Sequence, residues 1–220
     1  MRDADMVIIA DSFPLLEELD ISGLWYAVTD KGVDALSSIL GSFRKINLSG
    51  NYCTSSGMTS NGISTVLRNS KSLNSLVLSG KQINSVGSRA LSTLVFGTMK
   101  ILDKLLDSIV RAGLPLKTLK LINCSNYIFA GISSLLQRYQ SLECLALTSV
   151  EFLTVESMKN LCQFIVEATS RNLSLCRELS TSTFLMLVES CSLLRNLCTR
   201  GTSLGRGRVC FEEELWNNLP

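Results

Sequence analysis

The chain has 220 residues, of which 46% are hydrophobic and 18% are charged, with 21 Lys and Arg against 19 Asp and Glu. This composition is too apolar for a disordered chain, and a net charge of +2 gives no basic surface that would favour nucleic acid. Histidine is absent, which removes the residue type behind Ser-His and Cys-His nucleophiles and most zinc sites. We therefore expect no enzymatic activity, no cofactor, no metal and no nucleic-acid partner.

The N-terminal segment carries acidic residues where a secretory signal needs positive charge. Its apolar run from Met6 to Ala10 is too short to cross a membrane. We therefore expect a cytoplasmic or nuclear protein with no membrane partner. The eight cysteines form no Cys-x-x-Cys pair, and in a reducing compartment free thiols are the expected state.

A block of the form Leu-x-x-Leu-x-Leu recurs along the chain and predicts short strands. Five clear copies cover residues 16–21, 43–48, 73–78, 116–121 and 142–147, and two weaker copies cover 170–175 and 194–199. The alternation points the first, fourth and sixth positions inward and the third and fifth outward. The expected fourth positions are Leu19, Ile46, Leu76, Leu119, Leu145, Leu173 and Leu197.

A second recurring block lies between the strand blocks and predicts a helix. It begins with an apolar residue, usually continues with Thr, Ser or Asn as an N-cap, and has a small residue at its fifth position. Its copies begin at Val28, Met58, Ile83, Tyr127, Leu153 and Leu179, and the small residues are Gly32, Gly62, Gly87, Gly131, Ser157 and Thr183. Residues 1–14 resemble the end of such a helix and are expected to be a partial first repeat.

Most of the expected fourth positions are 24 to 30 residues apart, close to the period of a leucine-rich repeat. We expect a single α/β solenoid over residues 1–199 with about seven strand units, similar to the ribonuclease-inhibitor horseshoe, with parallel strands on the concave face and helices on the convex face. The step from Leu76 to Leu119 is longer, and the helical periodicity of residues 96–113 predicts an inserted convex helix. This helix would either pack back on the solenoid or bind a partner. Residues 200–220 are expected to form an irregular tail.

The segments SFPLLEELDIS, VTDKGVDALSSIL, RKINLSGN and KTLKLINC resemble the cysteine-containing leucine-rich repeats of plant-type F-box proteins. The resemblance covers about residues 12–199. In that pattern Asn or Cys ends the strand segment: Asn51 and Cys124 stand there, whereas Leu24, Lys81 and Val150 depart from it. The resemblance implies the substrate-recognition part of an SCF-type ubiquitin ligase.

No F-box is visible in the sequence, so the chain resembles a truncated or partly degenerate member of this family. The SCF adaptor is expected to bind only if an F-box exists outside this chain. The alternative function is a stand-alone scaffold or inhibitor that binds protein without ubiquitin chemistry, or a truncated member without ligase function.

The outward positions of the strand blocks form the expected binding surface for a protein substrate on the concave face. Its charge changes along the chain from acidic through basic to neutral and polar. The candidate residues are Glu18, Asp20, Lys45, Asn47, Ser75, Thr118, Lys120, Asn172 and Ser174. We interpret this surface as a shallow groove that binds a protein of mixed charge. The alternative interpretation is a solvent-exposed strand face that has no partner.

Overall fold

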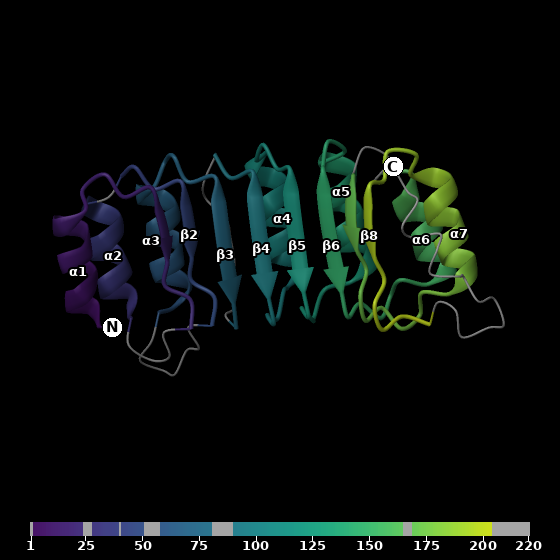
Figure 1. Cartoon of the computed structure of the whole chain (residues 1–220), viewed down its shortest axis with the longest axis horizontal. Coiled ribbons are helices and arrows are strands. Elements are labelled where there is room, and N and C mark those ends of the chain that lie inside the picture. The colour runs from purple at the N-terminus through teal and green to yellow at the C-terminus, as the bar shows by residue number, and fades with distance from the viewer. Residues whose placement is uncertain are drawn as a thin grey trace.

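The computed structural model describes residues 2–23, 28–39, 41–50, 58–80, 90–164 and 169–203, which form one layer of strands and one layer of helices (Figure 1). The strands are β1 Glu18–Asp20, β2 Lys45–Asn47, β3 Ser75–Ser79, β4 Thr93–Gly97, β5 Thr118–Ile122, β6 Cys144–Thr148, β7 Ser170–Asn172 and β8 Asn196–Cys198. The helices are α1 Asp3–Ser12, α2 Asp30–Ile39, α3 Ser60–Asn69, α4 Asp103–Ala112, α5 Phe129–Arg138, α6 Val155–Cys162 and α7 Thr181–Ser190.

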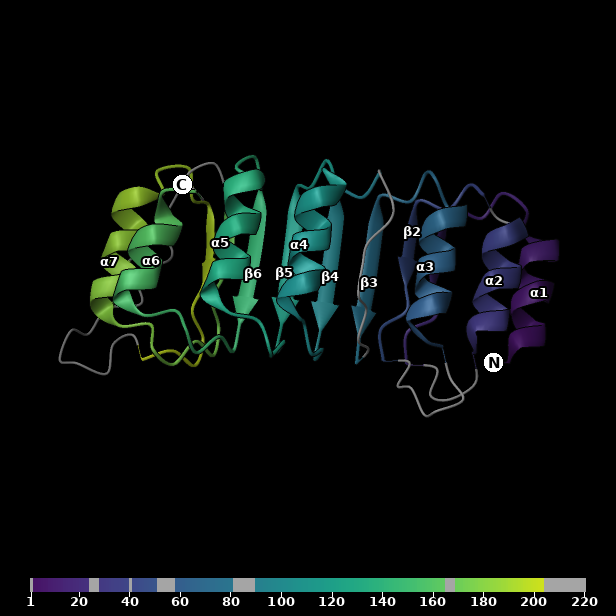
Figure 2. The ribbon, with the colours of Figure 1, turned by 180° about the vertical axis from the view of Figure 1, so that it is seen from behind.

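These strands form one parallel sheet of eight, and their order in the sheet follows their order in the chain. Figure 2 shows the helices side by side over one face of that sheet. The opposite face carries no helix layer in the described part of the chain (Figure 1). We call this opposite face the strand face.

The core lies between the two layers and is built by the alternation of the strand blocks. The second residues of five successive strands pair in register and are at most 1% exposed: Ile46, Leu76, Leu94, Leu119 and Leu145. A second buried row follows two residues later: Leu48, Leu78, Phe96, Leu121 and Leu147. Each unit therefore completes its interior against the next unit, as expected for a solenoid.

The described residues form one strand more than predicted, and they correct the inserted helix of residues 96–113. Residues Thr93–Gly97 form β4, which pairs in register with β3 and β5. The helix α4 begins only at Asp103 and ends at Ala112, where the left-handed Gly113 caps it, so it is the ordinary helix of the β4 unit. The segment from Leu91 to Phe96 is a strand block in which Phe takes the last apolar position. The helix block predicted from Ile83 lies outside the described residues.

A left-handed turn follows every strand. The turn residue lies four positions after the second residue of its strand, and its φ is between 51° and 71°. These residues are Gly23, Gly50, Gly80, Thr98, Asn123, Ser149, Leu175 and Gly201. Glycine is frequent here because a Cβ atom disfavours positive φ. The spacing of these turns marks the register of each repeat independently of its leucines.

The register of the seventh strand differs by two residues from the prediction. Arg171, and not Leu173, is the central residue of β7, and it pairs with Leu145 and Leu197. Arg171 is only 1% exposed, and its Nη2 lies 4.0 Å from Sγ of Cys191. A guanidinium therefore occupies the interior position that Leu fills in the neighbouring strands.

Two cysteines become equivalent in the corrected register. Cys124 and Cys176 each follow the left-handed turn residue of their repeat. Sγ of Cys124 donates to the carbonyl of Phe96 at 3.3 Å, and Sγ of Cys176 donates to the carbonyl of Leu147 at 3.1 Å. Burial raises the pKa of both thiols. Each thiol thus stabilises the turn by binding a carbonyl of the preceding strand, which is a structural role.

Hydrogen bonds between the first helices connect successive units. The carboxylate of Asp3 in α1 accepts from the backbone N–H of Thr29 at 2.7 Å and from its hydroxyl at 2.6 Å. Asp30 in α2 accepts the same two bonds from Thr59, both at 2.6 Å. A carboxylate of one unit therefore fixes the N-cap residue of the next unit.

The recurring glycine of the helix block makes room for this carboxylate. A Cβ atom at Gly32 would lie 2.5 Å from Oδ1 of Asp3, and one at Gly131 would lie 2.6 Å from Oδ1 of Asp103. Gly62 stands in the same relation to Asp30. The glycines thus repeat because two neighbouring helices approach closely at this point.

The variant Gly62→Ala is expected to lower the free energy of unfolding by about 1 to 3 kcal/mol, because the new methyl group displaces Asp30 from Thr59. The matched control is Gly41→Ala, since no atom lies within 4 Å of a Cβ at Gly41. Gly41→Ala should leave stability unchanged or slightly raised. Urea unfolding of both variants measures the difference, and equal effects would contradict the close approach at Gly62.

Candidate binding surface on the strand face

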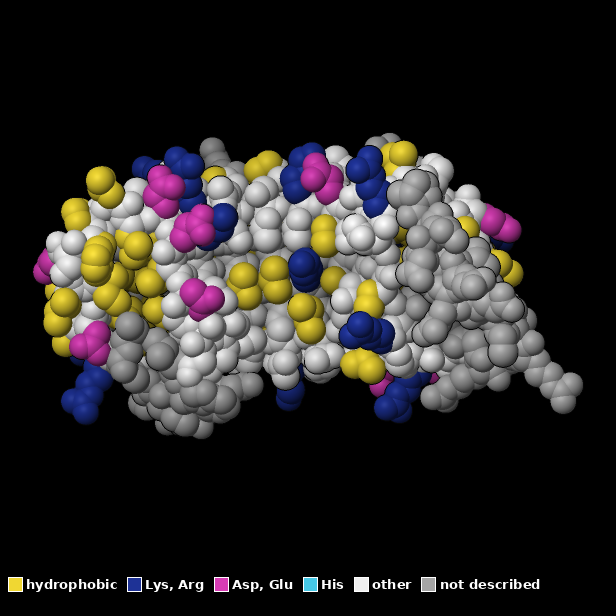
Figure 3. All heavy atoms as spheres, in the orientation of Figure 1, with side chains coloured by type: hydrophobic (Ala, Val, Ile, Leu, Met, Phe, Trp, Pro, Cys, Tyr) yellow, Lys and Arg dark blue, Asp and Glu magenta, His cyan; other side chains and the backbone are white. Residues whose placement is uncertain are grey.

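Two rows of outward side chains cover the strand face. The first row contains Glu18, Lys45, Ser75, Thr93, Thr118, Cys144, Ser170 and Asn196. The second row contains Asp20, Asn47, Val77, Val95, Lys120, Ala146, Asn172 and Cys198. The first row is mostly polar, whereas the middle of the second row is apolar. Figure 3 shows hydrophobic side chains in the middle of this face and charged ones near the first strands.

The end of the face over β1 to β3 is acidic and shallowly hollowed. Glu18 forms an ion pair with Lys45 at 2.7 Å. The carboxylate of Asp20 accepts from the N–H of Ser22 at 2.8 Å and from Nδ2 of Asn47 at 2.9 Å. Hydrogen bonding by Ser22 lowers the pKa of Asp20, which therefore stays ionised at neutral pH. A hollow of about 340 Å³ opens here, lined by these residues together with Ser75 and Val77.

A second hollow, of about 420 Å³, lies over β5 to β8. Lys120 lines it together with the apolar Ile122, Ala146 and Leu197. Hydroxyl, amide and thiol side chains also line it: Cys144, Ser170, Asn172, Asn196 and Cys198. No carboxylate lines it. Arg171 also lines this hollow, and its Nη2 lies 4.0 Å from Sγ of Cys191. This hollow can accept an anionic or a hydrogen-bond-accepting group.

The thiol of Cys198 lies in this second hollow and is partly exposed. Its Sγ is 3.2 Å from Oγ of Ser174, and hydrogen bonding by Ser174 lowers the pKa of Cys198. Because the thiolate is the reactive form, iodoacetamide should modify Cys198 faster than the buried Cys176. The variant Ser174→Ala should slow this reaction at pH 7, whereas Ser170→Ala should not. Peptide mass spectrometry over time measures the rates, and an unchanged rate in Ser174→Ala would contradict this role of the hydroxyl.

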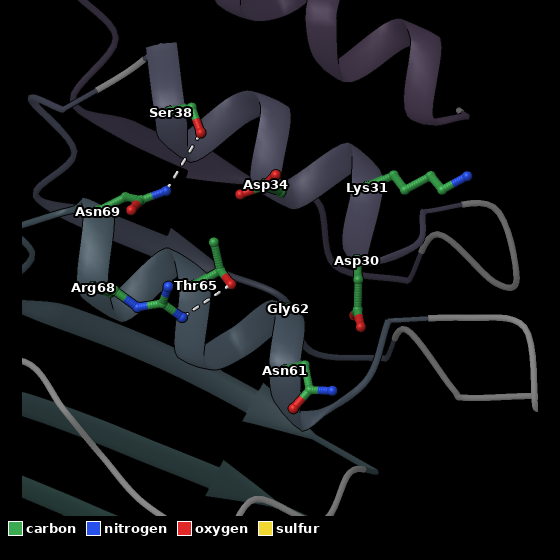
Figure 4. Close-up of a pocket in the computed structure, with 9 residues that line it drawn as sticks. All are labelled: Asp30, Lys31, Asp34, Ser38, Asn61, Gly62, Thr65, Arg68 and Asn69. Carbon is green, nitrogen blue, oxygen red and sulfur yellow. Dashed lines mark hydrogen bonds between the residues drawn. The ribbon is translucent and has the colours of Figure 1, made fainter.

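A further hollow, of about 440 Å³, lies on the helix layer between α2 and α3 (Figure 4). Nδ2 of Asn69 donates to Oγ of Ser37 at 3.1 Å and to Oγ of Ser38 at 3.4 Å. Arg68 donates to the hydroxyl of Thr65 at 3.4 Å. These polar side chains bond to one another along or between the two helices, so we interpret this hollow as the groove between neighbouring units.

The structure places eight of the nine candidate residues on the two outward rows: Glu18, Asp20, Lys45, Asn47, Ser75, Thr118, Lys120 and Asn172. Asn172 lies in the second row and not in the first, and Ser174 lies beyond the end of β7. Both differences follow from the register shift at Arg171. The prediction missed Thr93 and Val95 on β4 and Ser170 on β7, and the equivalence of Cys124 and Cys176 could have revealed Ser170.

Within the described ranges, no group of three His, Cys, Asp or Glu side chains could hold a metal ion. None of the helices in these ranges has the length and apolar character needed to cross a bilayer.

Comparison with known proteins gives structural neighbours only. No family model matches the sequence, and no curated protein matches it. Among solved structures, internalin C2 from Listeria monocytogenes is similar with a TM-score of 0.52 and 17% identity over 94% of this chain and 78% of that one. TLR13, solved in complex with ssRNA13, is similar with a TM-score of 0.50 and 16% identity over 86% of this chain. The chain spans about a third of TLR13, since the match covers 33% of that protein.

The fold is a leucine-rich repeat solenoid. Parallel strands, one helix layer and unit-by-unit stacking agree with these neighbours. In this leucine-rich repeat chain the strands line the concave face and the helices the convex face, as the sequence predicted. The identities are too low to carry over any partner.

Proposed function

We propose that this chain binds another protein through its strand face and performs no catalysis of its own. The observation that supports this is a face of a parallel sheet that no described helix covers, because such sheets usually have both faces covered. Val77 and Val95 are half-buried in the middle of this face. A partner that covers them would remove apolar surface from water, which drives protein association. The acidic Glu18 and Asp20 on the same face favour a protein over a nucleic acid.

Interface variants can test this proposal with a matched control on the other layer. Val95→Arg places a charge in the middle of the strand face, and Val188→Arg places the same charge on the exposed side of α7, where Val188 is 50% exposed. Partners captured from cell extract by the wild-type chain should be lost with Val95→Arg and kept with Val188→Arg. Circular dichroism should show both variants folded. Loss with Val188→Arg alone would contradict binding on the strand face.

The finer proposal, a substrate-recognition part of an SCF-type ubiquitin ligase in the cytoplasm or nucleus, rests on the resemblance of the repeats to plant-type F-box proteins. It predicts that the parent protein supplies an F-box and that the SCF adaptor purifies with that protein. Recovery of a strand-face partner without the adaptor would favour the alternative, a scaffold or inhibitor without ligase function.

A further inference from the structure

The second row of the strand face has an ordered charge pattern. From β1 to β5 it reads Asp20, Asn47, Val77, Val95 and Lys120. Neighbouring strands lie about 4.8 Å apart, so four strand steps separate Asp20 from Lys120 by about 19 Å. Figure 3 shows acidic, hydrophobic and basic side chains in this order towards the middle of the face.

No described neighbour forms an ion pair with either charge of this row. The groups that bind Asp20 are neutral: the N–H of Ser22 and the amide of Asn47. Among the described residues, no Lys or Arg nitrogen lies within 4.0 Å of the Asp20 carboxylate, and no carboxylate oxygen lies within 4.0 Å of Nζ of Lys120. In the first row, by contrast, Glu18 and Lys45 neutralise each other at 2.7 Å.

Each end of the pattern lies beside a hollow that can receive a side chain. The hollow of about 340 Å³ is lined by Asp20, and the hollow of about 420 Å³ is lined by Lys120. Between them Val77 and Val95 offer an apolar surface. The row therefore complements a ligand with a cation at one end, an anion at the other and apolar groups between them.

We propose that this row binds a helical segment of a partner protein that carries a basic and an acidic side chain at its ends and apolar side chains between them. The inference deepens the proposed function and depends on it. Two side chains eleven positions apart lie on the same side of a helix, about 16.5 Å apart along its axis. The length of Lys and Glu side chains spans the remaining distance to Lys120 and Asp20. Residues four and seven positions from the first end would contact Val77 and Val95.

Three synthetic helical peptides test this pattern against the full chain. All carry Leu at the two intermediate positions, and the end pairs are Lys with Glu, Lys with Lys, and Glu with Glu. The wild-type chain should bind the Lys/Glu peptide about three- to fivefold more tightly than either like-charged peptide. This preference should decrease with added salt, because Asp20 is exposed and Lys120 is only half-buried. Fluorescence anisotropy measures the dissociation constants.

Variants with reversed charge at Asp20 or Lys120 test the pattern most directly, because each should prefer a different peptide. Lys120→Glu should change the preference to the Lys/Lys peptide, and Asp20→Lys should change it to the Glu/Glu peptide. The double variant Asp20→Lys/Lys120→Glu should prefer the Lys/Glu peptide again, bound in the opposite direction. Thermal unfolding checks that each variant folds, and if Lys120→Glu does not fold, Asp20→Lys alone tests the same pattern.

Absent binding of all three peptides, or equal binding of all three, would overturn the inference. A captured partner that is lost with Val95→Arg but kept with both charge variants would overturn this pattern and leave the proposed function standing. A captured partner that is kept with Val95→Arg would instead overturn the proposed function.

Discussion

The variant Leu119→Ala is expected to lower the free energy of unfolding by about 2 to 5 kcal/mol, because it leaves a cavity in a packed core. Leu119 is fully buried and lies in register between Leu94 and Leu145, in the middle of the sheet. A cavity there weakens the packing of the units on both sides, since the buried side chains of each unit pack against those of its neighbours. Urea unfolding followed by circular dichroism measures the loss.

The neighbouring variant Lys120→Ala is the control, because Lys120 lies on the outward row one residue later. Its effect on stability should stay within about 0.5 kcal/mol. The two substitutions differ by one position and by the face of the sheet. Equal destabilisation by both would contradict the strand register.

The second large effect is expected from Arg171→Leu at pH 5, where Cys191 is protonated: the free energy of unfolding should rise by about 1 to 4 kcal/mol. Arg171 is 1% exposed and stands in register between two leucines, Leu145 and Leu197. Burial lowers the pKa of its guanidinium, a sign that the charged form is poorly solvated there. Leucine at this position removes the buried charge and restores the interior of the neighbouring strands.

The increase in the free energy of unfolding should depend on pH, because Cys191 ionises near Arg171. Hydrogen bonding by Cys162 and the positive charge of Arg171 lower the pKa of Cys191 from 9.0 to about 6. A lowered pKa stabilises the folded wild type above pH 9, and this contribution is lost as the pH falls through 6. The advantage of Arg171→Leu should therefore be largest below pH 6 and should shrink towards pH 9.

The exposed Arg195 of the loop before β8 offers a matched control for this prediction. Arg195→Leu should leave stability nearly unchanged at all pH values. A loss of stability in Arg171→Leu at pH 5 would show that the contacts of the guanidinium outweigh the cost of burying it.

The sequence predicted the solenoid well because its leucines alternate where the packing is regular. Strands such as β3 and β5 have Leu at each inward position. N-cap residues such as Thr59 and Thr154 indicate where their helices begin. The strand β4 escaped prediction because Phe96 takes the place of the last Leu. The distance from Leu76 to Leu94 is also shorter than a usual repeat.

The register of β7 could not be obtained from hydrophobicity. Leu173 and Leu175 alternate as inward residues would, yet Leu175 is the left-handed turn residue and is 50% exposed. The true inward residue is Arg171, which is charged, whereas the repeat pattern has an apolar residue at this position. Only the equivalence of Cys124 and Cys176 in the chain would have indicated it. The same shift displaced Ser174 from the candidate surface, whereas the acidic and basic ends at Asp20 and Lys120 were located correctly on their strands.

Because each strand leaves the sheet through the same left-handed turn, one unit can be duplicated or deleted without rebuilding the units beside it. Such an event would change the distance between Asp20 and Lys120 by one strand spacing, about 4.8 Å. The number of units between the two charges therefore sets the length of the helical segment that this row would match. In this way gene duplication could adjust the length that is recognised while the chemistry at each end stays the same.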